Sequence, residues 1–244
     1  MELHDVVPVI LVSNEEYWLP YSLKAIIGKF PRYVIYDVGS QDRTRDIIDW
    51  FIPNCGGEIF YRTMPMVPRE VQGAFRNSMI AEAKSNYYLI VDGDEVWSEQ
   101  ALDLLPKAIE DMYFGWQYNK IYGVVRRKEL NYNLTHEYVE QRTHHRIYSR
   151  EAYWLGTHPG EVAGIGQKPA TELDFPNILV HHFHNTLRSS TEDAALKRME
   201  RKSQKTYHPG AQQPFNLLDE LPILRARVEH FPVSPLLEKL WDAQ

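Results

Sequence analysis

Residues 86–100 read NYYLIVDGDEVWSEQ and place an apolar run directly before three acidic residues. The apolar run at 87–91 predicts a buried β-strand over residues 87–92. Asp92, Asp94 and Glu95 come directly after the apolar run. Acidic side chains are costly to bury unpaired. The end of this strand is therefore the first candidate for a functional site.

Upstream of this strand the chain alternates between apolar runs and helical patterns. The apolar runs predict strands at residues 6–12, 32–38 and 58–62. The helical patterns lie between them, at residues 15–30, 44–51 and 68–85. Ser13 and Asn14 can cap the first of these helices. The alternation predicts an α/β fold, with a mostly parallel sheet flanked by helices.

Polar residues gather where three of these strands end. They read SNEE at 13–16, DVGSQD at 37–42 and DGDE at 92–95. Ligands of parallel α/β sheets bind beyond the carboxyl ends of the strands. We therefore expect the three polar stretches to form one site.

The second half of the chain has a less regular pattern. We expect strands at 120–130, 143–150 and 177–185, followed by a polar, basic helix at 189–208. The five prolines after residue 208 predict a tail that wraps the surface in short helical pieces. With no internal repeat or linker, we expect one domain over residues 1–208, in halves 1–97 and 98–208, with a C-terminal extension at 209–244.

Composition restricts the class of protein. The 244 residues are 43% hydrophobic and 25% charged, which suits a folded globular chain. The net charge of −6 argues against general nucleic-acid binding. The single cysteine, Cys55, suits a reducing compartment, and no apolar run approaches the roughly 18–20 residues that span a bilayer. We expect no signal peptide and no transmembrane segment, and a cytoplasmic protein or one held peripherally at a membrane.

Asp92 and Asp94 lie two residues apart, so in an extended chain their carboxylates point the same way. Two carboxylates held together favour a bound cation, and oxygen ligands suit Mg²⁺ or Mn²⁺. Gly93 between them permits close approach. The alternative is a solvated turn, because Asp-Gly is a favoured turn pair.

Four motifs in order carry a resemblance to a known family. They are VILVSNEE, the turn Asp37-Val38-Gly39-Ser40-Gln41-Asp42-Arg43-Thr44, the helical Phe75-Arg76-Asn77, and Asp92-Gly93-Asp94-Glu95. Together they resemble the nucleotide-sugar half of family 2 glycosyltransferases with the GT-A fold. Phe75 departs from the alanine that is usual there. The resemblance is clearest over residues 6–97.

The resemblance implies roles for residues in the first half and for Arg188. Val12, Asn14, Glu15, Asp37, Gly39, Arg76, Asp92, Gly93 and Arg188 would bind the donor, with Asp37 reading its base and Arg76 and Arg188 near its diphosphate. Asp94 would ligate the metal, and Asp92 would contact ribose or the metal. Three of these residues have a structural alternative: Asp37 as a turn residue, Glu15 as a first-turn charge, and Arg76 as a salt-bridge partner of an aspartate.

The resemblance also implies a further metal ligand from the segment LVHHFHN. In a strand, His182 and His184 lie on the face of Ile178 and Val180. We favour His182 as the ligand, with His184 as the alternative. A histidine that only packs in the core is the competing interpretation.

A catalytic base is expected in YWLGTHPGEV, residues 153–162, which resembles a tryptophan–glycine–His–Glu region of the family. Pro159-Gly160 separates His158 from Glu161, a departure that leaves the base open. Glu161 is the first choice and His158 the second, with Asp174 as a further candidate. Trp154 would line a sugar site or pack in the core.

These inferences predict a metal-dependent glycosyltransferase that moves a sugar from a UDP- or GDP-linked donor to a hydroxyl, with inversion. The acceptor would be a glycan, a lipid-linked molecule or another hydroxyl compound. One alternative is a nucleotide-sugar- or glycan-binding protein without turnover. A nucleotidyltransferase is less favoured, because SNEEYW lacks a glycine-rich basic loop.

Overall fold

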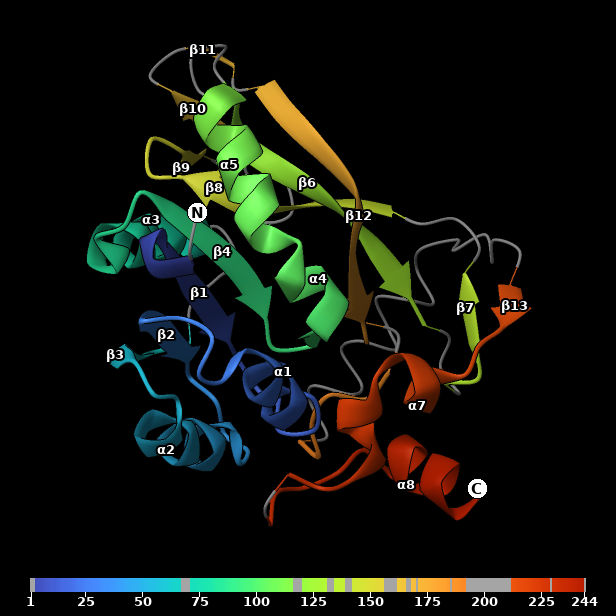
Figure 1. The fold of residues 1–244 in the computed structure, drawn as a ribbon. Helices are drawn as coiled ribbons and strands as arrows, with labels where there is room; N and C mark the ends of the chain where they lie inside the picture. Colours follow the sequence, from blue (N-terminus) through green and yellow to red (C-terminus); the bar gives the residue numbers. More distant parts are fainter. Residues whose placement is uncertain are drawn as a thin grey trace.

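The fold is an eight-stranded mixed sheet with helices on both faces (Figure 1). The computed structural model describes residues 3–66, 71–115, 120–130, 134–138, 142–155, 162–165, 168–169, 171–184, 186–191, 212–228 and 230–243. The helices are η1 Leu3–Asp5, α1 Leu19–Ile26, α2 Thr44–Asn54, α3 Gln72–Ala83, α4 Glu99–Asp103, α5 Leu105–Gly115, α7 Leu217–Glu220, η4 Pro222–Arg225 and α8 Pro235–Asp242. The strands are β1 Val6–Val12, β2 Arg32–Val38, β3 Glu58–Met64, β4 Tyr87–Asp92, β5 Glu95–Trp97, β6 Lys120–Glu129, β7 His136–Tyr138, β8 Arg142–Ser149, β9 Tyr153–Leu155, β10 Val162–Ile165, β11 Lys168–Pro169, β12 Thr171–His182 and β13 Gln212–Pro214.

The predicted parallel half of the sheet is confirmed. The strand order is β3-β2-β1-β4-β8-β6-β12-β5, and the first four strands are parallel. Strands β8 and β5 pair antiparallel with their neighbours, whereas β6 and β12 are parallel. The carboxyl ends of β1, β2 and β4 therefore lie side by side, as the site prediction requires.

Two cores cover the two faces of the sheet. The larger core takes Leu23 of α1, Ile47 of α2 and Ile109 of α5. The smaller core takes Met79 of α3, with Val9 and Ile90 from the sheet. Because β1 and β4 are buried on both faces, nearly all their residues are apolar, which is why the sequence predicts them to the residue.

The start of the first helix differs from the prediction. Helix α1 begins at Leu19 with Trp18 as N-cap, and Pro20 occupies the first turn, where proline is tolerated. Ser13 and Asn14 do not cap it. Asn14 has a positive φ of 54° and turns the chain towards the loop after β2 instead.

The third predicted strand of the second half also differs. Strand β12 runs from Thr171 to His182, with an irregularity between Phe175 and Leu179. It therefore begins earlier and ends earlier than expected, and His184 lies beyond it. Residues 192–211 lie outside the described residues. They include most of the basic helix predicted at 189–208 and the predicted domain boundary at 208.

The C-terminal residues form short helices, as predicted, but they pack more deeply than a surface wrap. Leu217, Leu218, Leu221, Leu224 and Leu237 are each at most 2% exposed and join the larger core. Figure 1 shows α7 and α8 together below β12.

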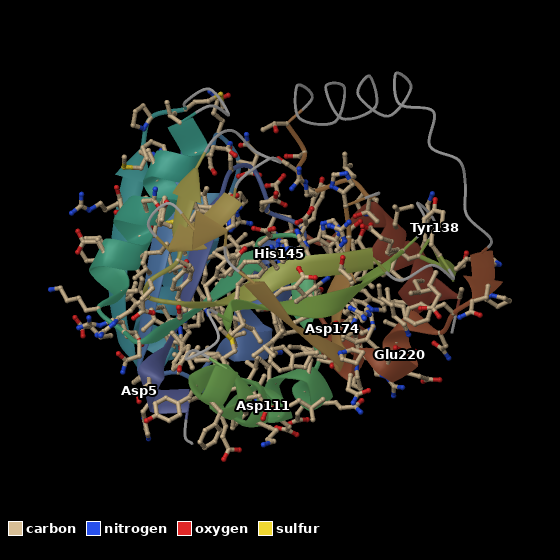
Figure 2. All side chains as sticks on the ribbon, turned by 90° about the horizontal axis from the view of Figure 1, so that it is seen from above. Asp5, Asp111, Tyr138, His145, Asp174 and Glu220 are labelled. Atoms are coloured by element: carbon tan, nitrogen blue, oxygen red, sulfur yellow. The ribbon has the colours of Figure 1, made fainter. Side chains whose placement is uncertain are left out.

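An ionic cluster adds to this packing. Glu220, labelled in Figure 2, accepts hydrogen bonds from Lys128 at 2.8 Å and shares a 3.1 Å contact with His181. The hydrogen bond of His181, together with Lys128, lowers the pKa of Glu220 to about 2. The C-terminal segment is thus tied to β6 and β12.

Candidate active site

The loops after β1 and β2 are joined by hydrogen bonds. The Asn14 N–H donates to Ser40 Oγ at 3.0 Å, and the Gln41 N–H donates to Asn14 Oδ1 at 2.8 Å. The Glu15 N–H donates to Thr44 Oγ1 at 2.9 Å. Asp42 accepts the Thr44 N–H at 2.9 Å, so it holds this turn and the start of α2. The two polar stretches form one surface.

Asp37 is fully buried at the end of β2. Its Oδ1 accepts the Ser40 N–H at 3.1 Å, and its Oδ2 accepts Arg45 Nε at 2.8 Å. The turn-stabilising role is therefore present, and a base-reading role stays a prediction. Gly39 has φ +65°, and a Cβ there would lie 2.7 Å from the backbone nitrogen of Met66. The turn accepts no side chain at this position.

The segment Asp92–Glu95 does not stay extended. Gly93 and Asp94 form a turn between β4 and β5, so the extended chain on which the argument for two aligned carboxylates depends is not present. A Cβ at Gly93 would lie 2.8 Å from Glu15 Cγ and 3.1 Å from Val12 Cγ1. The glycine thus lets the loop after β1 lie directly against this turn.

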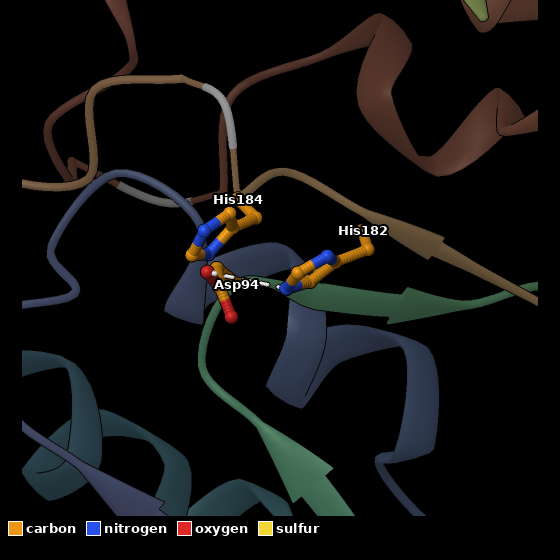
Figure 3. Close-up of side chains that lie close together, drawn as sticks. All are labelled: Asp94, His182 and His184. Carbon is orange, nitrogen blue, oxygen red and sulfur yellow. Dashed lines mark ion pairs between the residues drawn. The ribbon is translucent and has the colours of Figure 1, made fainter. Parts of the chain in front are cut away.

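Asp94, His182 and His184 form a group that could hold a metal ion (Figure 3). One potential ligand atom from each lies within 4.8 Å of the others. His182 Nε2 is 3.6 Å from Asp94 Oδ2, and the two imidazoles stack with centroids 5.1 Å apart. Asp94 and His182 are buried, while His184 is partly exposed. Both histidines that the sequence suggested therefore face the same aspartate.

A buried carboxylate orients His182. Glu129 Oε1 lies 3.1 Å from His182 Nδ1, and Arg127 lies 2.6 Å from the same Glu129 oxygen. Burial lowers the pKa of His182, but Asp94 and Glu129 outweigh it and raise the pKa to about 9. Burial likewise opposes the charge of Glu129, yet His182 and Arg127 lower its pKa to about 2. A carboxylate on the second ring nitrogen is typical of a metal-ligating histidine.

Arg188 bridges two acidic loops of the site. Its Nη1 lies 3.0 Å from Asp94 Oδ2 and also donates to Glu15 Oε1. Burial disfavours its charge, but Glu15 and Asp94 raise its pKa. A fixed positive charge therefore lies beside the candidate metal ligands.

Asp92 lies in an arginine cluster and is not among the three grouped ligands. Arg146 donates to Asp92 Oδ2 at 2.6 Å and to Glu95 Oε2 at 2.7 Å, and Arg76 lies 3.6 Å from Asp92 Oδ1. The guanidinium of Arg76 stacks over Trp154, with its carbon 4.7 Å from the ring centroid. The salt-bridge alternative for Arg76 is thus present, and a donor contact by Arg76 or Asp92 stays a prediction.

The region expected to supply the base is only partly described. Glu161 and His158 lie outside the described residues. Trp154 is 8% exposed and packs against Tyr148, so its core role is confirmed. Asp174, labelled in Figure 2, is bound by Arg126 through two hydrogen bonds of 2.6 Å.

Several residues of the site had not been predicted. Arg127, Glu129 and Arg146 lie on β6 and β8, whose strands the sequence predicts without indicating their partners. A signal was present: VVRRKE and HHRIY place charged residues within predicted strands. Charges there require buried partners.

The chain belongs to glycosyl transferase family 2. The family model matches residues 9–187, well over half of the chain. The resemblance and the GT-A-like α/β fold expected from the sequence are thereby confirmed. None of the curated proteins compared with the chain matches it. Among the described residues, no helix is long and apolar enough to cross a membrane.

Solved structures resemble the chain at low identity. S. aureus TarS 1–349, in complex with UDP, is 14% identical with a TM-score of 0.47, over 72% of this chain and 61% of that one. Glucosyl-3-phosphoglycerate synthase from Mycobacterium tuberculosis, in complex with phosphoglyceric acid, is 15% identical with a TM-score of 0.41, over 61% of this chain and 57% of that one. A 4-diphosphocytidyl-2C-methyl-D-erythritol synthase from Anaerococcus prevotii is 11% identical with a TM-score of 0.42, over 82% and 97%. The chain thus spans about three fifths of the TarS fragment, and the family assignment rests on the family model.

Proposed function

We propose that this chain is a metal-dependent glycosyltransferase that moves a sugar from a UDP- or GDP-linked donor to an acceptor hydroxyl. One observation carries the proposal. In a chain of glycosyl transferase family 2, Asp94, His182 and His184 converge beside Arg188 at the carboxyl edge of a parallel sheet.

The donor atoms fit a divalent transition metal. One carboxylate and two imidazoles favour Mn²⁺ over Mg²⁺, because Mg²⁺ prefers oxygen ligands. A bound divalent ion would stabilise the negative charge that develops on a nucleoside diphosphate leaving group. Glu129 fixes the His182 ring, so that Nε2 faces Asp94. Asp92 has two arginine partners and is proposed as a contact to the donor ribose rather than as a primary ligand.

We assign Arg188, which lies beside this group, to the donor diphosphate. Arg188 is held by Glu15 and Asp94, and a phosphate oxygen beside Asp94 would lie within its reach. Such fixed charges stabilise a leaving group without having to reorganise during the reaction. The nucleoside is assigned to the loops that carry Asn14, Glu15, Asp37 and Gly39. Gly93 and Val12 lie against Glu15 of the first loop and are assigned to the same donor site.

Transfer with inversion requires a base that takes the proton of the acceptor hydroxyl. Glu161 remains the first candidate and His158 the second. Both follow β9, and Trp154 of β9 packs on Arg76 beside Asp92. The acceptor is proposed as a glycan, a lipid-linked molecule or another hydroxyl compound.

The test is release of nucleoside diphosphate from a panel of UDP- and GDP-sugars, with Mn²⁺, Mg²⁺ or chelator. We expect one donor to be hydrolysed or transferred at least tenfold faster with Mn²⁺ than with chelator. Donor binding without any release, even with acceptors supplied, would favour a binding protein. If no donor binds, the proposal is wrong. A nucleotidyltransferase would instead release pyrophosphate from a nucleoside triphosphate and a sugar phosphate.

A further inference from the structure

The segment after β12 carries two residues of the site, His184 and Arg188, yet it has no regular secondary structure. Its position relative to Asp94 must therefore come from contacts with other parts of the chain. The Phe183 N–H donates to the Asp94 carbonyl at 2.9 Å, and Arg188 contacts Glu15 and Asp94. Further contacts come from residues 16–18, about 170 positions earlier in the sequence.

Trp18 provides the apolar part of this attachment. Its ring stacks on Phe183 with centroids 3.8 Å apart, and both residues are fully buried. Its Nε1 donates to the Leu187 carbonyl at 3.0 Å. The Tyr17 N–H donates to the Arg188 carbonyl, also at 3.0 Å. The backbone on either side of Arg188 is thus fixed.

Glu16 provides the polar part. It is 2% exposed, and its Oε1 accepts the Ser190 N–H at 2.5 Å while its Oε2 accepts the Arg43 N–H at 3.2 Å. Within the described part of the chain it forms no ion pair. A buried carboxylate that binds only backbone N–H groups is costly for packing alone, because burial disfavours its charge. Two charge-assisted hydrogen bonds from different segments give it a geometric role.

We propose that Glu16 is a positioning residue for the metal site: it holds the segment with His184 and Arg188 against the loops that follow β1 and β2. The inference rests on the proposed function. Through Arg43, Glu16 also reaches the turn assigned to the donor nucleoside, so a single carboxylate connects three parts of the site. Glu15, its neighbour, contacts the Arg188 side chain directly, whereas the Glu16 carboxylate binds backbone N–H groups of Arg43 and Ser190.

The test is Mn²⁺ affinity of the purified full chain, measured by titration calorimetry for wild type and Glu16→Gln. Glutamine can accept only one of the two N–H groups with its oxygen, and its amide NH₂ meets the other. We expect the Mn²⁺ dissociation constant to rise about tenfold, as for other residues that orient metal ligands. Glu99→Gln, which removes an acidic side chain that is 85% exposed on α4, is the matched control and should bind as wild type does.

A merely structural role would give a different result. If Glu16→Gln lowers the thermal midpoint in chelator but binds Mn²⁺ as wild type does, the inference is overturned. If Glu16→Gln does not fold, Trp18→Phe replaces it. That variant keeps a ring against Phe183 and loses the bond to Leu187, so Mn²⁺ affinity that stays at the wild-type value would overturn the inference. A wild-type protein that binds no Mn²⁺ would overturn both this inference and the metal site on which it rests.

Discussion

Asp94→Asn is expected to reduce metal-dependent release of nucleoside diphosphate by about 10²–10³-fold, the scale seen when a residue that stabilises transition-state charge is removed. Asparagine keeps the size of the side chain but removes the negative charge that faces His182 at 3.6 Å and Arg188 at 3.0 Å. The variant would leave His182 and Arg188 without the carboxylate that faces them. Since it also removes one proposed metal ligand, its affinity for Mn²⁺ should fall.

The assay compares Asp94→Asn with wild type at saturating donor, with and without Mn²⁺, after both folds have been checked by thermal unfolding in chelator. Asp103→Asn, an exposed position on α4, controls for loss of one acidic group. If the activity of Asp94→Asn stays within threefold of wild type, Asp94 is not a residue of the active site.

Arg146→Met is expected to destabilise the folded protein by about 3–5 kcal/mol, because it breaks a buried charge network by removing one partner. Arg146 is 2% exposed, and Glu95, which it binds through two nitrogens, is fully buried. Burial opposes the charge of Arg146, but Asp92 and Glu95 raise its pKa. Without the guanidinium, Glu95 stays buried with much of its compensating charge gone.

Urea unfolding measures this effect, and Arg150→Met, whose side chain is 65% exposed at the end of β8, is the control. Adding Glu95→Gln to Arg146→Met should recover part of the loss, because the uncompensated charge is then removed. A free energy of unfolding within about 1 kcal/mol of wild type would show that the network contributes little to stability.

The sequence predicted the fold where burial leaves a local signal. Strands β1 and β4 are apolar on both faces, so their limits follow from the residues alone. Strand β12 has no such signal at its start, where TELDFP alternates charged and apolar residues around an irregularity. The end of β12 at His182 also could not be inferred from the sequence. Because His184 lies beyond the strand, the argument that His182 and His184 share a strand face does not hold.

The residues of the site that belong to short sequence motifs were predicted. Asp94, His182 and His184 do come together, although the residues that hold them were not predicted. Glu129 lies 53 positions from His182, and Glu16 lies 174 positions from Ser190. Such pairs depend on the register of β6 against β12 and on how loops meet, and neither has a local pattern. The Asp-Gly pair was open to both interpretations, because the same two residues suit a metal-binding loop and a solvated turn.

The most direct test of the account is a pulsed EPR measurement on the wild-type protein with Mn²⁺ and the nucleoside diphosphate of its donor. The account predicts two couplings to the same ion: ¹⁴N from the histidine imidazoles and ³¹P from the diphosphate. The ¹⁴N coupling should be replaced by ¹⁵N in protein made with ¹⁵N-histidine. Bound Mn²⁺ that shows no histidine nitrogen, or no phosphorus when the nucleotide is present, would contradict a metal site built from Asp94, His182 and His184 to hold a sugar donor.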